Sequence, residues 1–288
     1  MTKEDIMIVV GVDGSVTARA AVEWAANDAF RMRVPLRIVH AVDRTPYQIH
    51  KFPTPWLSDA LAGEGQRILR EAAALARERQ PSIEVTTQDV EGLPAAVLRE
   101  QDKEATEIVV GCRGRGGFAG ALLGSVSVHV AGQARCPVVV VRGDHRPVRG
   151  EVVVGVDDSP ECEPALAYAF EQARLRGATL RVLHAWQLPV HAFAPEAAYD
   201  LDEVREAQHR LVSDRVRVFA SDYPEVKVVE EAPSAHPVDA LTTASGQADL
   251  LVVGSHGRGG LGSALLGSVS RGVLHHARCP VAVVRAEF

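Results

Sequence analysis

Short apolar runs alternate along the whole chain with longer segments that have helical spacing. An unbroken run of Val, Ile and Leu bounded by polar residues is typical of a strand buried on both faces, and apolar residues three or four apart predict an amphipathic helix. In the first half, this pattern predicts strands at 6–12, 36–42, 83–90, 108–111 and 137–142, with helices at 18–33, 58–79, 93–101 and from about 125.

The second half repeats this order of elements. Its strands are predicted at 152–156, 180–185, 226–231, 250–254 and 281–285, and its helices at 165–176, 195–220, 238–245 and 268–277. Strands that alternate with helices imply right-handed crossovers and a parallel sheet with helices on both faces. A single eight-stranded α/β barrel of this length is the rival fold, but five strands in each half argue against it.

The sequence itself is duplicated. Residues 111–141 and 254–284 align at an offset of 143 with 20 identities in 31 positions, and the opening strands align at an offset of 144. A period this long indicates a duplicated domain and not a solenoid repeat. We therefore expect one domain at 1–142, a polar linker at 143–150 and a second domain at 151–288.

Composition narrows the classes of function. The 288 residues carry 31 basic and 37 acidic side chains, a net charge of −6, which is the wrong balance for a protein that coats nucleic acid. No apolar run reaches the roughly 18 residues that a membrane span needs, and from the charged residues at 1–5, which lead straight into a predicted strand, we expect no secretion signal. The cysteines at 112, 136, 162 and 279 are scattered, which favours reduced thiols over a disulfide framework or zinc site. We expect a cytoplasmic protein that neither binds nucleic acid nor enters a membrane.

A glycine-rich loop follows the fourth strand of each half. It begins Gly111-x-x-Gly114 and ends, after nine residues, in Gly124-Ser125; the second copy begins at Gly254 and ends in Gly267-Ser268. Such a loop emerges at the carboxyl edge of the sheet, where open α/β folds bind ligands. Its free N–H groups and the following helix N-terminus suit phosphate, with Ser125 and Ser268 expected as N-cap residues. Cationic side chains that can assist are Arg113, Arg115, His256 and Arg258.

Three other interpretations of these glycine motifs can be weighed from the residues. A tight glycine turn with capped helices and no ligand remains an alternative for either copy. A P-loop is disfavoured because no GK[ST] triplet follows, and the missing GxGxxG after the first strand weakens a dinucleotide dehydrogenase.

An aspartate ends the first strand of each half. Asp13 and Asp157 can accept hydrogen bonds from a ligand or help to hold a hydrated Mg²⁺ or Mn²⁺ beside phosphates. The alternative is an Asx turn or N-cap at the start of the first helix, shared with Ser15 and Ser159.

These motifs and the order of elements resemble the universal stress protein family in its tandem, ATP-binding form. The resemblance covers nearly the whole chain and implies two doubly wound, five-stranded α/β/α sandwiches with strand order 3-2-1-4-5. It also implies that the fifth strands, Val138–Val141 and Val281–Val284, pair between domains. The nucleoside end of ATP would lie against Gly11, Asp13, Ala41, Gly155, Asp157 and Ala185. The family usually has Val at the two alanine positions, but that contact is largely with the main chain.

The resemblance also assigns the phosphates to the glycine-rich loops. In the first half, the expected contacts are Gly111, Arg113, Gly114, Arg115, Gly116, Gly117, Gly124, Ser125, Val126 and Ser127. In the second half, they are Gly254, His256, Gly257, Arg258, Gly259, Gly260, Gly267, Ser268, Val269 and Ser270.

The sequence thus predicts an ATP-binding regulator of stress response or growth with two nucleotide sites per chain. No catalytic base is evident, because His40 and His184 lack a paired nucleophile and are expected to pack near the site. The alternatives are a slow Mg-dependent ATP hydrolase or phosphotransferase that uses Asp13 and Asp157, and a structural module whose loops bind nothing. We also expect a homo-oligomer, a dimer, and lids over the site at 43–57 and 187–194. Either another chain or a protein partner is expected to read the nucleotide state.

Overall fold

The computed structural model describes residues 6–43, 55–115, 123–143, 147–187, 201–257 and 265–286. The chain divides into two compact units, Met1–Arg146 and Pro147–Phe288, and the division falls inside the segment predicted as a linker. Among the described residues, no helix is long and apolar enough to cross a lipid bilayer.

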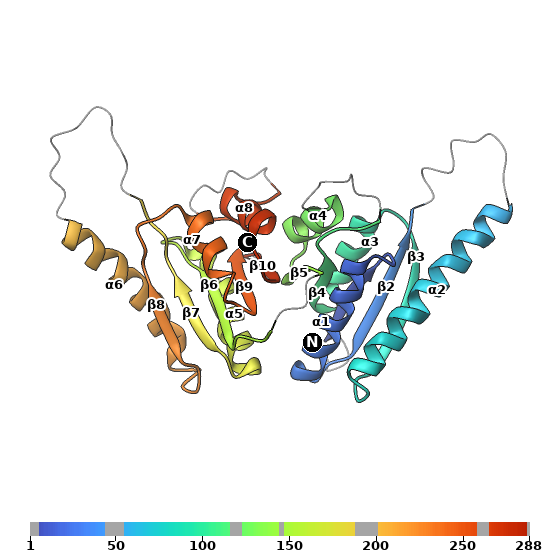
Figure 1. Cartoon of the computed structure of the whole chain (residues 1–288), viewed down its shortest axis with the longest axis horizontal. Helices are drawn as coiled ribbons and strands as arrows, with labels where there is room; N and C mark the ends of the chain where they lie inside the picture. The colour runs from blue at the N-terminus through green and yellow to red at the C-terminus, as the bar shows by residue number, and fades with distance from the viewer. Residues whose placement is uncertain are drawn as a thin grey trace, which may run out of the picture. The chain divides into compact units, whose positions relative to one another are not determined.

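The first unit, blue to green in Figure 1, is a parallel sheet between two layers of helices. Its strands pair in the order β3-β2-β1-β4-β5, as the resemblance implies. Helices α1 and α2 pack together on one face, and α3 and α4 on the other. The elements are β1 (Met7–Val12), α1 (Val16–Met32), β2 (Leu36–Val42), α2 (Pro55–Arg79), β3 (Val85–Glu91), α3 (Pro94–Glu100), the 3-10 turn η2 (Gln101–Lys103), β4 (Ala105–Gly111), α4 (Ser125–Gln133) and β5 (Val138–Val141).

The second unit, yellow-green to red in Figure 1, repeats this topology with the strand order β8-β7-β6-β9-β10. Helices α5 and α6 pack together, as do α7 and α8. The elements are β6 (Glu151–Gly155), the 3-10 turn η3 (Pro160–Cys162), α5 (Glu163–Arg176), β7 (Thr179–Leu183), α6 (Leu201–Ala220), β8 (Val228–Glu231), α7 (Pro237–Ala244), β9 (Leu250–Gly254), α8 (Ser268–His276) and β10 (Val281–Val284). The α/β fold class predicted for both halves is confirmed.

The inner strands of both sheets are buried on both faces, as their apolar runs predict. Ile8, Val9 and Val10 of β1 have no exposed surface, and Val152–Val154 of β6 are equally buried. Burying such side chains contributes about 1.5–3 kcal/mol each. The strands β3 and β8 lie last in their sheets and are half-exposed, which agrees with their more polar sequences.

Helices α1 and α5 both lie close to their sheets through a row of buried alanines, at 21, 25 and 29 in α1 and at 165, 169 and 173 in α5. They differ at single positions, where for example Ala26 of α1 aligns with Phe170 of α5. In α5, Phe170 is fully buried and stacks on Phe219 at 5.8 Å and on a tyrosine at 5.4 Å. The two copies therefore share a topology but fill their cores differently.

The end of each of these helices has the same left-handed turn with a different residue. Arg33 adopts φ 57° after α1, and Gly177 adopts φ 58° after α5. Their N–H groups return to carbonyls of the last helical turn, which is the usual way to satisfy a helix C-terminus. Only glycine adopts this conformation without a steric cost, so the first copy carries local strain at Arg33.

Candidate functional site

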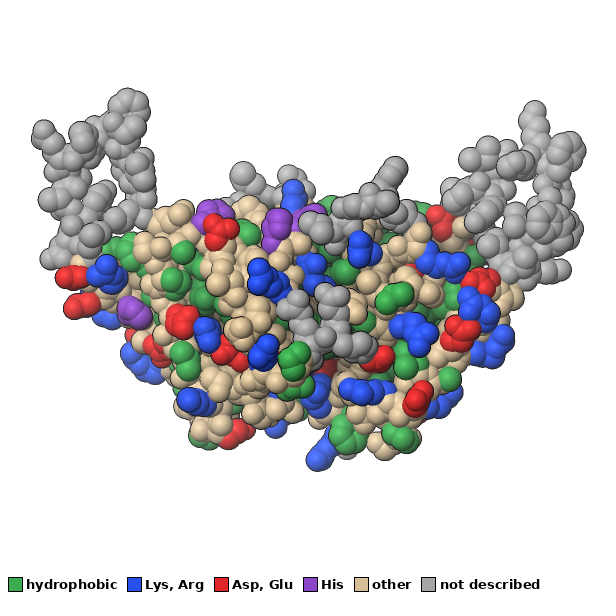
Figure 2. All heavy atoms as spheres, in the orientation of Figure 1, with side chains coloured by type: hydrophobic (Ala, Val, Ile, Leu, Met, Phe, Trp, Pro, Cys, Tyr) green, Lys and Arg blue, Asp and Glu red, His purple; other side chains and the backbone are tan. Residues whose placement is uncertain are grey.

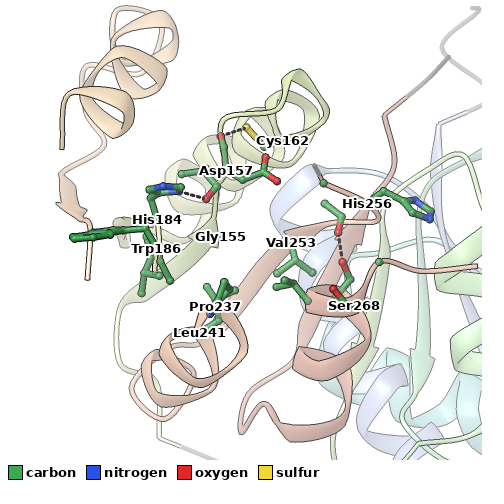
Figure 3. A pocket seen from close by; sticks show the side chains of 18 of the residues that line it. Gly155, Asp157, Cys162, His184, Trp186, Pro237, Leu241, Val253, His256 and Ser268 are labelled. Carbon is green, nitrogen blue, oxygen red and sulfur yellow. Dashed lines mark hydrogen bonds between the residues drawn. The ribbon is translucent and has the colours of Figure 1, made fainter. Parts of the chain in front are cut away.

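A cavity of about 710 Å³ opens at the carboxyl end of the sheet in the second unit. The strands β6, β7 and β9 end at it, and helices α6, α7 and α8 contribute to its walls. In Figure 3, His184 and Trp186 lie at one end of the cavity, and His256 and Ser268 lie at the other. Pro237 and Leu241 of α7 provide apolar surface between them.

Every described residue that the sequence assigns to the second site lines this cavity. The members come from the ends of three strands, the glycine-rich loop and the first turn of α8. They are Gly155, Asp157, Ala185, Gly254, His256, Gly257, Gly267, Ser268, Val269 and Ser270. Arg258, Gly259 and Gly260 lie outside the described residues.

The first unit brings its predicted residues to the same edge of its sheet. Gly11 and Asp13 lie at the end of β1 and just beyond it, Ala41 lies near the end of β2 beside Val90 of β3, and the glycine-rich loop follows β4. The other predicted residues that are described belong to that loop or to the start of α4: Gly111, Arg113, Gly114, Arg115, Gly124, Ser125, Val126 and Ser127. Gly116 and Gly117 lie outside the described residues.

In each copy, the strand-end aspartate lies against the second glycine of the loop. A Cβ on Gly114 would be 2.5 Å from Oδ2 of Asp13, and a Cβ on Gly257 would come even closer to Oδ2 of Asp157. No side chain fits in that space unless the carboxylate moves. Neither glycine has a positive φ, so the contact with the aspartate, and not the turn conformation, favours glycine here.

The Asp13 carboxylate anchors the glycine-rich loop to the start of α1. Its Oδ1 accepts the Ser15 N–H at 3.0 Å, and its Oδ2 accepts the Arg115 N–H at 2.7 Å. The hydroxyl groups of Ser15 and Thr17 also donate to the Arg113 carbonyl oxygen. The Asx turn that we considered as an alternative is thus present, together with a loop contact that the sequence did not predict.

Asp157 makes the corresponding turn in the second unit. Its Oδ1 accepts the Ser159 N–H at 3.1 Å and the Ser159 hydroxyl at 2.5 Å. The Cys162 thiol, which lines the cavity, donates to the Asp157 carbonyl oxygen at 3.5 Å. Burial raises the pKa of the Cys162 thiol, so it remains protonated at neutral pH.

The predicted N-caps at Ser125 and Ser268 are wrong by one residue. Helix α4 begins at Ser125 and α8 at Ser268, so the N-cap positions belong to Gly124 and Gly267, and no side chain caps either helix. The chain folds back at these glycines, and their N–H groups donate to Cys112 O and Ser255 O, each at 2.8 Å. An uncapped helix N-terminus leaves main-chain N–H donors available to an anion.

A second serine in each helix holds that N-terminus against the sheet. The Ser127 hydroxyl donates to the Gly111 carbonyl oxygen at 2.8 Å, and the Ser270 hydroxyl donates to the Gly254 carbonyl oxygen at 2.6 Å. Both serines are buried. These bonds fix the first turn of each helix relative to the end of the strand, where the N–H donors converge.

The equivalent histidines His40 and His184 have different partners. Nδ1 of His40 lies 2.9 Å from Oδ1 of Asp89, whereas His184 bonds the Val156 carbonyl through Nδ1 and Oε1 of Gln208 through Nε2, both at 2.9 Å. Gln208 aligns with Gly65, and a Cβ on Gly65 would lie 2.7 Å from the Asp89 carboxylate. Each unit therefore supplies one side-chain partner to its histidine, Asp89 in the first unit and Gln208 in the second.

Several residues of the cavity wall carry no sequence motif. Trp186, Gln208 and Leu241 line it. Of these three, only Leu241 could have been predicted, by comparing the two halves of the sequence. Leu241 aligns with Leu98, and both leucines rest on the glycine that ends the first strand of their unit. A repeated leucine opposite a repeated strand glycine is the signal that sequence reasoning missed.

The cysteines that precede the fifth strands pack as the sequence suggests. Desolvation raises the pKa of the partly buried Cys136 thiol to about 12, and Cys279 is buried. A thiol with such a pKa is almost entirely protonated at neutral pH and is therefore a poor nucleophile.

Of the two predicted lids, 43–57 and 187–194, the parts at 44–54 and 188–194 lie outside the described residues, and Gln187 lines the cavity.

Comparison with known proteins agrees with this architecture. The family model described as "Universal stress protein family" matches residues 7–142 and 149–285. Universal stress protein Rv2005c of Mycobacterium tuberculosis is 38% identical over 96% of each chain, and Rv2623 of the same organism is 34% identical over 96% of each. A crystal structure of a universal stress protein from Archaeoglobus fulgidus shares the fold, with a TM-score of 0.72, 20% identity and coverage of 97% of this chain and 96% of that one.

The fold and the repeated loops thus define a tandem α/β protein with one candidate ligand site in each half. The chain belongs to the universal stress protein family, in its two-domain form.

Proposed function

We propose that this chain binds ATP at two sites, one at each glycine-rich loop, and acts as a nucleotide-dependent regulator. The observation that carries the proposal is the cavity of the second unit, where the uncapped N-terminus of α8, the main chain of a glycine-rich loop and an apolar wall meet. Phosphate suits the first two features, and a nucleobase suits the third.

The size and lining of the cavity support a nucleotide over a simple anion. A volume of about 710 Å³ is in the range of sites that hold ligands of drug size. Trp186, fixed by a hydrogen bond from its ring N–H to the Ala232 carbonyl at 2.9 Å, and Leu241 offer surface for a base. Ser268 and the loop glycines lie at the other end of the cavity, where the phosphates would bind.

A divalent cation fits beside the phosphates only with help from the nucleotide. Asp157 provides a carboxylate at the cavity, but its Oδ1 is engaged by Ser159, and both oxygens of Asp13 accept main-chain N–H groups. Among the described residues, no three His, Cys, Asp or Glu side chains cluster as metal ligands. Mg²⁺ or Mn²⁺ would therefore be held largely by phosphate oxygens and water, with Asp13 and Asp157 as outer contacts.

The surface does not favour nucleic acid as the ligand. On the face drawn in Figure 2, Lys and Arg side chains are interspersed with Asp and Glu, and the whole chain carries a net charge of −6. A nucleic-acid-binding face would show a continuous basic area.

The direct test is to denature the purified protein and identify the released nucleotide by ion-exchange chromatography, followed by calorimetric titration with Mg-ATP. We expect two ATP per chain.

Gly114→Val and Gly257→Val should each remove one site, because the new side chain displaces Asp13 or Asp157 from the loop. Gly63→Val is the matched control, since a Cβ on that helical glycine meets nothing within 4 Å. Unchanged stoichiometry in the Gly114/Gly257 double variant would reject the sites.

Turnover and association test the remaining parts of the proposal. A regulator should hydrolyse ATP slowly, and many turnovers per site per minute would favour the hydrolase or phosphotransferase.

A regulator that signals through its nucleotide state also needs something to read that state, and we propose a second copy of the chain. Light scattering at micromolar concentration should show a dimer, and a monomer with and without ATP would refute that part.

A further inference from the structure

Arg115, one of the predicted phosphate ligands of the first unit, is held at both its main chain and its side chain. Its N–H donates to Oδ2 of Asp13 at 2.7 Å, and its Nη1 donates to Oε1 of Glu64 at 2.8 Å. Glu64 lies on α2, 51 positions away in the sequence, so this ion pair joins the glycine-rich loop to a helix on the face of the sheet.

Glu64 is a strong acceptor for this guanidinium. The same carboxylate also accepts two hydrogen bonds from Arg67, at 2.8 and 2.7 Å. Hydrogen bonds from Arg67 and Arg115 lower the pKa of the Glu64 carboxyl to about 2, so it is fully ionised at neutral pH. The Glu64–Arg115 ion pair is therefore present at any pH at which the phosphates of a nucleotide are ionised and can compete with Glu64 for the arginine.

The two repeats differ at this carboxylate but not at the arginine. At the offset of 143 that aligns the glycine-rich loops and the strands after α2 and α6, Arg115 corresponds to Arg258. Glu64 corresponds to Ala207, which has no charge. The loop sequence was kept in both copies, whereas the carboxylate that holds it is present at this position only in the first.

We propose that Glu64 competes with the phosphates of the nucleotide for Arg115 and so weakens ATP binding at the N-terminal site. The inference rests on the proposed ATP site. A carboxylate and a phosphate both accept hydrogen bonds from the in-plane N–H groups of a guanidinium. While Nη1 of Arg115 is bound to Glu64, the side chain is directed towards α2, so Arg115 cannot serve both anions fully. Glu64 is a positioning residue, which directs Arg115 towards α2 and away from the loop.

The size of the effect follows from the exposure of the pair. The side chains of Arg115 and Glu64 are 57% and 38% exposed, so solvent screens their attraction. Exposed pairs are weak, and we expect a change in affinity of about two- to fivefold and not an on–off switch.

The test isolates the N-terminal site with Gly257→Val and titrates ATP and adenosine in parallel. Glu64→Gln should tighten ATP binding by about two- to fivefold and leave adenosine binding unchanged, because adenosine lacks the competing phosphates. The matched control is Glu71→Gln: Glu71 lies on the same helix and pairs with Arg67 at 2.6 Å, but among the described residues it does not contact Arg115. In an Arg115→Gln background, Glu64→Gln should have no effect.

Three results would overturn the inference. ATP affinity that is unchanged or weaker in Glu64→Gln would show that the pair does not oppose binding. An equal gain for adenosine, or the same gain in Glu71→Gln, would assign the effect to the packing of α2. If neither site of the unmodified chain binds ATP, the proposed function falls and this inference with it, whereas ATP binding without the Glu64 effect rejects the inference alone.

Discussion

At the residue scale, the carboxylate of Asp157 has a role that can be separated from general stability. It accepts two hydrogen bonds from Ser159 and lies against Gly257 at the proposed site. Asp157→Asn should weaken ATP binding at the C-terminal site about tenfold, because a charged acceptor contributes about 1.5–3 kcal/mol. Calorimetric titration in a Gly114→Val background measures this site by itself.

Asp249 provides a control for this substitution. It lies at the amino end of β9, at the opposite edge of the sheet, and accepts main-chain N–H groups from 149–151 at 2.7–3.2 Å. Asp249→Asn should lower the free energy of unfolding by about 1–3 kcal/mol and leave ATP affinity unchanged. Equal losses of affinity in the two variants would mean that Asp157 acts only through the fold.

The left-handed turn at Arg33 gives a prediction of increased stability. Glycine occupies the equivalent position 177 with nearly the same φ, so Arg33→Gly should remove steric strain without moving the chain. We expect the free energy of unfolding of the N-terminal unit to rise by about 0.5–1 kcal/mol, measured by urea denaturation. Gly177→Ala should lower it in the other unit by a similar amount, and a loss of stability in Arg33→Gly would refute the interpretation.

At the scale of elements, the histidine networks show how α6 is attached to the carboxyl edge of its sheet. In the second unit, the partner of His184 comes from α6, whereas in the first unit the partner of His40 comes from β3. Position 89 is Asp and aligns with Ala232, just as Gly65 aligns with Gln208. The two arrangements are alternative solutions to the same requirement for a hydrogen bond.

This exchange predicts a compensating pair of substitutions. Gln208→Gly alone should destabilise the C-terminal unit by about 1–2 kcal/mol, because the buried His184 loses a side-chain partner. Adding Ala232→Asp should restore most of that loss by recreating the arrangement of the first unit. Denaturant unfolding of the two single variants and the double variant measures the coupling, and simple additivity would contradict it.

The strands were the easiest elements to predict, and the cavity walls were the hardest. Val152–Val154 and Val138–Val141 could be read as strands because unbroken β-branched runs are rarely anything else. The loop residues were found because a duplicated motif marks them twice. Gln208 and Trp186 could not be found in this way, because their sequence neighbours form no motif. The position of Gln208 depends on how α6 packs against the sheet, and that of Trp186 depends on its hydrogen bond to Ala232, just after β8.

Local boundaries explain the remaining error. Serine is a common N-cap residue, so placing Ser125 and Ser268 at that position followed the general rule. The structure instead has glycines there, and the N–H group of each donates to a carbonyl oxygen of the preceding loop, which fixes where the helix begins. A backbone contact between residues 12 positions apart overrides the preference of a side chain for its own helix.

At the scale of the whole molecule, ligand binding should appear as thermal stability. A nucleotide at a concentration of 100 times its Kd stabilises the native state by about 2.7 kcal/mol, which raises the Tm of a unit of this size by about 5–10 °C. Calorimetry with saturating Mg-ATP should show this increase, and Gly257→Val should lose the part that belongs to the C-terminal unit. The same Tm with and without ATP would contradict the proposal.

The contact between a carboxylate and a bare glycine also limits how this chain can evolve. At Gly114 and Gly257, any larger residue collides with the aspartate, and an aspartate that moves away releases the turn that it holds. A substitution of either the glycine or the aspartate alone disrupts the loop, so mutational drift should leave both residues in place or remove both. Descendants of such a duplication that abandon one pocket are therefore expected to lose its glycine and its aspartate together.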